Sequence, residues 1–174
     1  MIELLNFILI ALVAFSGIII GAFLIFSALE EYSPGKLYFK WFKKIILFIL
    51  ILILLFYADT HYSIIIGLLI GFLLSLLIKE YFFLGLSLVI GFLTSKEFGL
   101  LIATFIFIFG LPYGTLELRF YKVRTNILIK KIIYCFILFI IPFISLFFQN
   151  FMLNNIALFI GIVSGALFNF ILKR

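Results

Sequence analysis

Long apolar runs, separated by short polar or charged clusters, follow one another along the whole chain. Seven runs can be marked, at residues 4–29, 45–58, 63–78, 81–95, 98–116, 132–148 and 156–172. Because hydrocarbon offers no water to the polar groups of the backbone, each run is predicted to be helical. The pattern therefore predicts an all-α fold, a polytopic transmembrane helical bundle.

The number of spans depends on the three short runs at 45–58, 63–78 and 81–95. A helix that crosses a bilayer needs roughly 17–25 apolar residues. These runs must therefore be extended by flanking aromatic residues, or they indicate local thinning of the bilayer or reentrance. We predict about seven spans, with six as the alternative, in a single integral membrane domain that covers residues 1–174.

The basic residues test this arrangement. With the amino terminus outside and seven alternating spans, one side of the membrane holds Lys36, Lys40, Lys43, Lys44, Lys79, Arg119, Lys122, Arg124, Lys130, Lys131, Lys173 and Arg174. Lys96 alone falls on the other side. Because loops rich in Lys and Arg resist translocation, we predict a multi-pass protein of the cell membrane with a cytoplasmic carboxyl terminus. Six spans would divide the basic loops between the two sides.

Composition agrees with this location. Apolar residues make up 67% of the 174 residues and charged residues only 11%, which is more apolar surface than a soluble domain of this size can bury. The net charge of +6 would suggest nucleic acid as a partner of a soluble protein. In a membrane protein it indicates topology and attraction to anionic headgroups, so we expect a lipid bilayer and no nucleic acid. The bias toward Ile, Leu, Phe and Lys is compatible with a prokaryotic source.

Glycines four residues apart occur in the first, third, fifth and seventh runs. The pairs are Gly17 with Gly21, Gly67 with Gly71, Gly110 with Gly114, and Gly161 with Gly165. Such pairs allow helix backbones to approach closely, and random placement of the glycines would give roughly one pair. We expect them to pack helices within one chain rather than between two chains. The second and sixth runs contain no glycine and are predicted to face lipid.

Pro112, Tyr113 and Glu117 form the most unusual stretch of the chain. Proline removes a backbone donor and should kink the fifth helix, while helical spacing places Tyr113 and Glu117 on one face. A carboxylate just beyond a kink could bind a cation, accept a proton or pair with an arginine. The alternative is an interfacial glutamate at a helix end, beside Arg119 and Lys122.

The same stretch resembles a fragment of stage II sporulation protein M-like membrane proteins, which carry a Pro-His-Gly-x-x-Glu-[Leu/Ile] motif. The matching residues are Pro112, Gly114, Glu117 and Leu118, whereas Tyr113 replaces the histidine. The resemblance covers about seven residues well and about forty poorly. It implies a non-catalytic membrane component that works with other proteins, for instance in envelope remodelling.

Aromatic and basic residues alternate directly after the turn signal Ser33-Pro34-Gly35. This segment, KLYFKWFKK, suits an interfacial helix whose rings lie at headgroup depth and whose lysines contact anionic lipid. The predicted headgroup ligands are Lys36, Lys40, Trp41, Lys43 and Lys44.

Candidate chemistry elsewhere is sparse. Asp59 and His61 are two potential ligands in a short outer loop, and Cys135 is the lone cysteine, so we predict no metal site and no cofactor. We find no convergent catalytic set and predict that the chain is not an enzyme. A non-enzymatic scaffold or subunit that binds lipid, partner membrane proteins or itself is favoured. The alternatives are a transporter or channel for an ion or small hydrophobic solute, and, third, an intramembrane enzyme. A polar cavity lined by Glu117, Asn169 and serines would favour transport, and a dry glycine-packed core would favour a scaffold.

Overall fold

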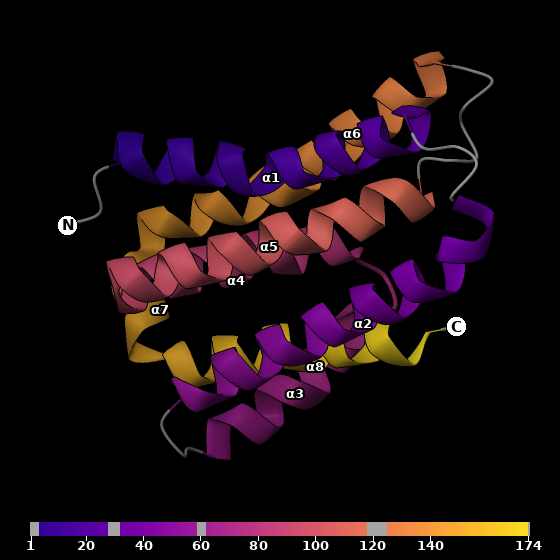
Figure 1. Ribbon diagram of the computed structural model, residues 1–174. Coiled ribbons are helices and arrows are strands. Elements are labelled where there is room, and N and C mark those ends of the chain that lie inside the picture. Colours follow the sequence, from indigo (N-terminus) through magenta and orange to yellow (C-terminus); the bar gives the residue numbers. More distant parts are fainter. Residues whose placement is uncertain (1–3, 28–31, 59–61, 118–124, 174) are drawn as a thin grey trace.

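The computed structural model describes residues 4–27, 32–58, 62–117 and 125–173, and every regular element in these ranges is a helix. The elements are α1 (Leu4–Ser27), α2 (Tyr32–Phe56), α3 (Tyr62–Leu74), α4 (Glu80–Thr94), α5 (Lys96–Glu117), α6 (Thr125–Ile140), the 3₁₀ helix η2 (Ile141–Phe148), α7 (Gln149–Asn154) and α8 (Ile156–Leu172). The chain reverses direction from each long helix to the next, and the helices form one bundle (Figure 1). The all-α prediction is confirmed.

Most helices begin within a few residues of the apolar runs, whereas α6 begins seven residues early at Thr125 and α2 departs furthest. It starts at Tyr32, so the expected interfacial segment 36–44 is continuous with the run that follows it. No glycine or proline interrupts the chain between Lys36 and Phe56, and Pro34 lies in the first helical turn, where the helix needs no backbone donor. The segment 36–44 is therefore helical, and it forms the first part of α2.

Among the described residues, three helical segments are long and apolar enough to cross a membrane. They cover Leu4–Leu24, Lys96–Leu116 and Leu128–Asn154, and the last one joins α6, η2 and α7. The apolar helices α3, α4 and α8 are shorter. The 13 residues of α3 extend about 20 Å, which is less than the ~30 Å of a hydrocarbon layer.

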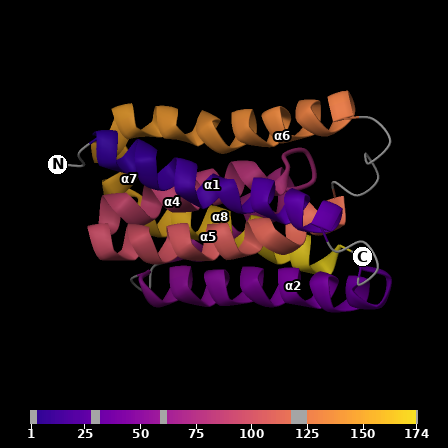
Figure 2. The same cartoon turned by 45° about the horizontal axis from the view of Figure 1, so that its top comes forward.

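Helix α4 forms the centre of the bundle. All residues from 83 to 92 are buried, and the helix packs against α5, α6, η2 and α8. Gly85 brings α4 onto α6, because a methyl group there would overlap the carbonyl of Phe139. Figure 2 shows α4, α5 and α8 between α6 on one side and α2 on the other.

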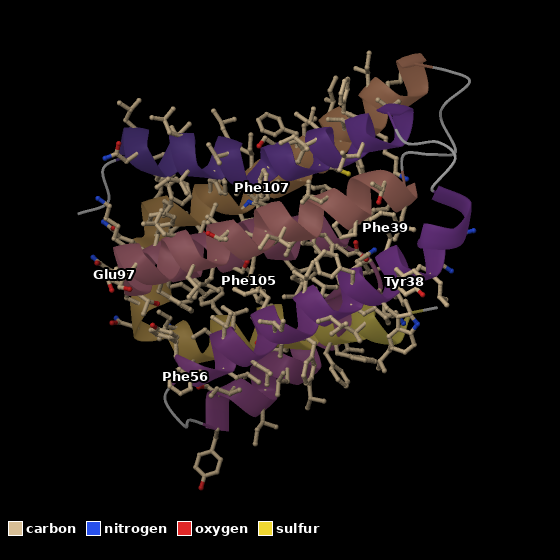
Figure 3. All side chains as sticks on the ribbon, in the orientation of Figure 1. Tyr38, Phe39, Phe56, Glu97, Phe105 and Phe107 are labelled. Carbon is tan, nitrogen blue, oxygen red and sulfur yellow. The ribbon has the colours of Figure 1, made fainter. Side chains whose placement is uncertain are left out.

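Helices α1 and α5 pack in parallel through two glycine pairs. Gly17 lies against the carbonyl of Phe107, labelled in Figure 3, and Gly110 lies against the backbone of Gly17 and Ile18. One turn further on, Gly21 and Gly114 repeat these contacts. A methyl group at any of these glycines would overlap backbone atoms of the other helix, so only glycine permits this spacing.

The other two glycine pairs join α3 and α8 in the same way. Gly67 lies against the carbonyl of Leu158 and Gly71 against that of Ile162, while Gly161 and Gly165 meet the backbone of α3. The helices are again parallel. The bundle thus contains two parallel helix pairs with the same type of contact, and all eight glycines pack within the chain.

The two prolines inside apolar segments have different surroundings. Helix α5 continues through Pro112 without a break. At Pro142, by contrast, the chain forms the 3₁₀ helix η2, which begins at Ile141, and the hydroxyl of Ser145 donates to the carbonyl of Pro142 (2.6 Å). The sequence pointed to the first proline as the main irregularity, whereas the change of helix type lies at the second.

Large apolar side chains cover the outside of the bundle. Leu9, Leu69, Ile137 and Phe151 are among the many that are more than half exposed. In the segment Leu128–Asn154, which contains α6, only 17% of the most apolar stretch is buried. This is the smallest buried share among the three long segments, and it agrees with the expected exposure of the sixth run to lipid. Helix α2 is two-sided, because Leu47 and Leu50 are fully buried while Phe48 and Leu52 are about half exposed.

Candidate functional site

Lysines gather at one end of the bundle, which we call the basic end. The starts of α2, α4 and α6 and the ends of α3 and α8 lie together there (Figure 1). These termini carry Lys36, Lys40, Lys43, Lys44, Lys79, Lys130, Lys131 and Lys173. Lys96 and Glu97 lie at the start of α5, at the opposite end, and Figure 3 shows Glu97 far from Tyr38 of α2.

Lys43 differs from its neighbours on α2 because its side chain turns into the bundle. Its Nζ lies 3.0 Å from Oε1 of Glu80, and the two side chains are only 16% and 15% exposed. This ion pair joins the middle of α2 to the first turn of α4. Lys36, Lys40 and Trp41 remain exposed and Lys44 is half-buried, so Lys43 alone departs from the predicted headgroup set.

Aromatic rings surround the ammonium group of Lys43. Its Nζ lies 4.8 Å from the centre of the Tyr113 ring and 5.7 Å from that of Phe109, both on α5. Ring faces carry negative charge density and attract cations, more strongly where water is excluded. We call the group formed by Glu80, Phe109 and Tyr113 the Lys43 cage.

Tyr81 supports the cage from α4. It is 2% exposed, and its ring meets that of Tyr113 edge to face, with centroids 4.9 Å apart. The Tyr81 hydroxyl has no hydrogen-bond partner among the described residues, and neither has Oε2 of Glu80. A buried oxygen atom without a partner is costly for a structural core, and two such atoms belong to neighbouring residues in this part of the described chain.

The predicted stretch on α5 contributes one residue to this cluster. Tyr113 is 6% exposed, and its hydroxyl lies 4.0 Å from Sγ of the buried Cys135 on α6. Pro112 is buried, and the hydroxyl of Thr115 donates to its carbonyl (2.8 Å). The side chain of Glu117 lies outside the described residues, so its position relative to Tyr113 remains a prediction.

A second polar cluster at the basic end joins α3 to α8. Nδ2 of Asn169 donates to Oγ of Ser75 (2.6 Å), and the Ser75 hydroxyl donates to the carbonyl of Phe72 (2.6 Å). Nζ of Lys173 donates to the carbonyl of Ser75 (2.9 Å) and lies 4.9 Å from the ring centre of Phe170. We call Ser75, Asn169 and Lys173 the α3–α8 clasp.

The other buried polar side chains of the described residues bond within their own helices or have no partner among those residues. Ser87 and Thr115 each donate to a carbonyl three residues earlier in their own helix, and Ser164 is buried without a partner among the described residues. A hollow of about 210 Å³ between α1 and α6 is lined only by apolar side chains. They are Ile8, Ala11, Leu12, Phe136, Phe139, Ile140 and Phe143.

Within the described ranges, no three His, Cys, Asp or Glu side chains come close enough to hold a metal ion. Asp59 and His61 lie outside these ranges. The Lys43–Glu80 pair was not predicted as a site, because Lys43 belongs to a basic run and Glu80 to a short polar loop. No local signal in the sequence identifies the pair, because the start of α2 at Tyr32 and the helix face that packs inward are known only from the structure.

Comparisons with known proteins found no matching family model, no matching curated protein and no matching solved structure. The resemblance to stage II sporulation protein M-like proteins therefore stays a prediction that rests on the residues around Pro112.

Proposed function

We propose that this chain is a non-enzymatic membrane scaffold or complex subunit, which crosses the bilayer about seven times and binds anionic lipid at its basic end. The observation that carries the proposal is the core, in which glycine contacts bring backbones together and buried hydroxyls bond mainly to their own helices. A transporter of polar solutes needs a polar lining near the bilayer midplane. A core of this kind suits a protein that holds its shape and offers its outer surface to partners.

The distribution of lysines supports the orientation. Eight lysines, six in helices and two directly beside helix ends, lie at the basic end, and Lys96 lies at the opposite end. With the basic end in the cytosol, the amino terminus is outside and the carboxyl terminus inside. Lys36, Lys40 and Lys44, with the exposed Trp41, are placed to meet anionic headgroups.

Gentle extraction from the source membrane tests the scaffold role. We expect one or more membrane proteins to co-purify in fixed proportion and to be lost when Gly71→Ala separates α3 from α8. Purification of the chain with bulk lipid but without any other protein would contradict the proposal.

Orientation is tested by single-cysteine labelling in a Cys135→Ser background. A membrane-impermeant maleimide should label Lys96→Cys on intact cells, and it should label Lys173→Cys only after permeabilisation. The reverse pattern would overturn the proposed orientation.

Transport of a small cation is the second candidate, and the Lys43–Glu80 pair favours it. Ionisable residues within membrane segments commonly mark ion or proton pathways. Flux of monovalent cations into liposomes that contain the purified protein, abolished by Glu80→Gln, would favour this function over the scaffold.

A further inference from the structure

The Lys43 cage has an occupant that satisfies it incompletely. Lys43 fills the space between the Glu80 carboxylate and the two rings of α5, yet Oε2 of Glu80 and the hydroxyl of Tyr81 are buried without partners among the described residues. Tyr81 is 2% exposed and packs directly on Tyr113, which forms one wall of the cage. A lysine offers only an ammonium group on an apolar stem and has no second polar atom.

We propose that the Lys43 cage is a binding site for a small primary ammonium that carries a neighbouring oxygen, as ethanolamine does, and that Lys43 is its built-in competitor. The incoming ammonium occupies the place of Lys43 Nζ, against Glu80 and the ring faces of Tyr113 and Phe109. The ammonium of the ligand has the same three N–H donors as Lys43, and the neighbouring oxygen, which lysine lacks, is an acceptor for the hydroxyl of Tyr81.

The exchange conserves charge. One ammonium leaves the cage as another enters, so the Glu80 carboxylate is never left buried without a cation, which would be strongly unfavourable. Lys43 has a flexible stem and lies between the half-buried Lys44 and the exposed Phe42 on α2, so its ammonium can turn outward to the headgroup region. A phosphate attached to the ligand would meet Lys43 there.

The position of the cage at the basic end allows two sources for this chemistry. An ethanolamine lipid of the adjacent leaflet presents the ammonium at headgroup depth, and free ethanolamine presents the same group from the aqueous phase. Choline, whose quaternary nitrogen has no N–H donor, would still meet the rings but would leave Oε2 of Glu80 unsatisfied.

Native mass spectrometry of the full-length protein, released from nanodiscs that contain phosphatidylethanolamine and phosphatidylglycerol, measures the first source. We expect preferential retention of phosphatidylethanolamine. Lys43→Ala should tighten its apparent Kd at least tenfold because the competitor is gone, and Glu80→Gln should weaken it at least tenfold. Lys96→Ala, which removes a lysine at the opposite end, should change the Kd less than twofold.

Free ethanolamine and choline, added to the same complexes, distinguish the sources. Displacement of the lipid by ethanolamine but not by choline shows that the headgroup ammonium is recognised. Binding of free ethanolamine without lipid preference assigns the site to the soluble amine. If Lys43→Ala fails to fold, Lys43→Met keeps the stem and should show the same gain.

The proposal is overturned if phosphatidylethanolamine and free ethanolamine bind no better than phosphatidylglycerol and choline. It is also overturned if removal of the Lys43 ammonium weakens binding. These measurements concern a ligand and not partner proteins. The ligand proposal can therefore be wrong while partner proteins co-purify, and ethanolamine can bind to a protein from which no partner co-purifies.

Discussion

Two polar clusters lie at the basic end of the bundle, and each binds or includes one lysine. In the α3–α8 clasp, Asn169 donates to Ser75, Ser75 donates to the carbonyl of Phe72, and Lys173 donates to the carbonyl of Ser75. In the Lys43 cage, the ion pair leaves one oxygen of Glu80 and the nearby hydroxyl of Tyr81 without partners among the described residues. The two lysines also differ in what they bind: Lys173 takes a backbone carbonyl and Lys43 a carboxylate.

The difference follows from the helices that each cluster joins. The clasp connects α3 and α8, whose backbones are already in contact through four glycines, so its hydrogen bonds complete an existing interface. The Lys43–Glu80 pair connects α2 and α4, whereas α2 packs mainly on α5 and α8. A satisfied cluster on a tight interface is structural. An unsatisfied one that bridges helices in looser contact can change its partners, and it is therefore the better candidate for binding.

The interface beneath the clasp should respond most strongly to mutation. In Gly71→Ala the new methyl group would overlap the carbonyl of Ile162, so α3 and α8 must move apart and the clasp must break. We expect the free energy of unfolding, measured by titration in mixed detergent micelles, to fall by about 3 kcal/mol.

Gly35→Ala is the matched control for this change. Gly35 lies near the start of α2, and a methyl group there would meet only the side chain of Phe39. Its stability should stay the same or rise slightly, because alanine favours the helix. Equal losses in the two variants would contradict the role assigned to the glycine contacts.

Removing the anion of the cage should have the next largest effect. Glu80→Ala leaves the ammonium of Lys43 largely buried without a carboxylate, and we expect a loss of about 2 kcal/mol in the same titration. Lys43→Met in addition should restore much of this loss, because the double variant has no uncompensated charge. A double variant as unstable as Glu80→Ala alone would show that the ion pair is unimportant for folding.

The sequence predicted the helices and the residues at their closest contacts. Apolar runs and glycine spacing are local patterns, so the positions of α1, α5 and α8 and the glycine pairs could be read from the chain alone. Which glycine pair meets which could not be read, because all four have similar surroundings. The match of Gly17 with Gly110, and of Gly67 with Gly161, depends on the path of the whole chain.

The candidate site was predicted only in part. Tyr113 was singled out because it stands between Pro112 and Gly114, and the structure places it in the wall of the cage. Lys43 and Glu80 are 37 residues apart and each belongs to a charged cluster, so nothing local distinguishes them from solvated neighbours. The sequence did not indicate which face of α2 meets α5, and this packing is what turns Lys43 inward.

The hydrogen bonds of the clasp should contribute a smaller amount. Asn169→Ala removes the donor to Ser75, and we expect a loss of about 1 kcal/mol, typical of hydrogen bonds between helices in membranes. Asn155→Ala is the control, because that amide donates to the carbonyl of Phe151 within its own segment. A loss for Asn155→Ala that equals the loss for Asn169→Ala would show that the clasp adds nothing specific.

The smallest effect is expected for a substitution at Tyr81. Whether this substitution raises or lowers the stability distinguishes the Lys43 cage from the α3–α8 clasp most clearly. Tyr81→Phe removes a buried hydroxyl that has no partner among the described residues, so stability should be unchanged or rise by about 0.5 kcal/mol. Tyr113→Phe, the matched change on the neighbouring ring, removes a hydroxyl that contacts Cys135 and should cost a little stability. If Tyr81→Phe instead destabilises the protein as much as Asn169→Ala, the Tyr81 hydroxyl has a partner in the folded protein. The cage would then be a satisfied structural cluster like the clasp.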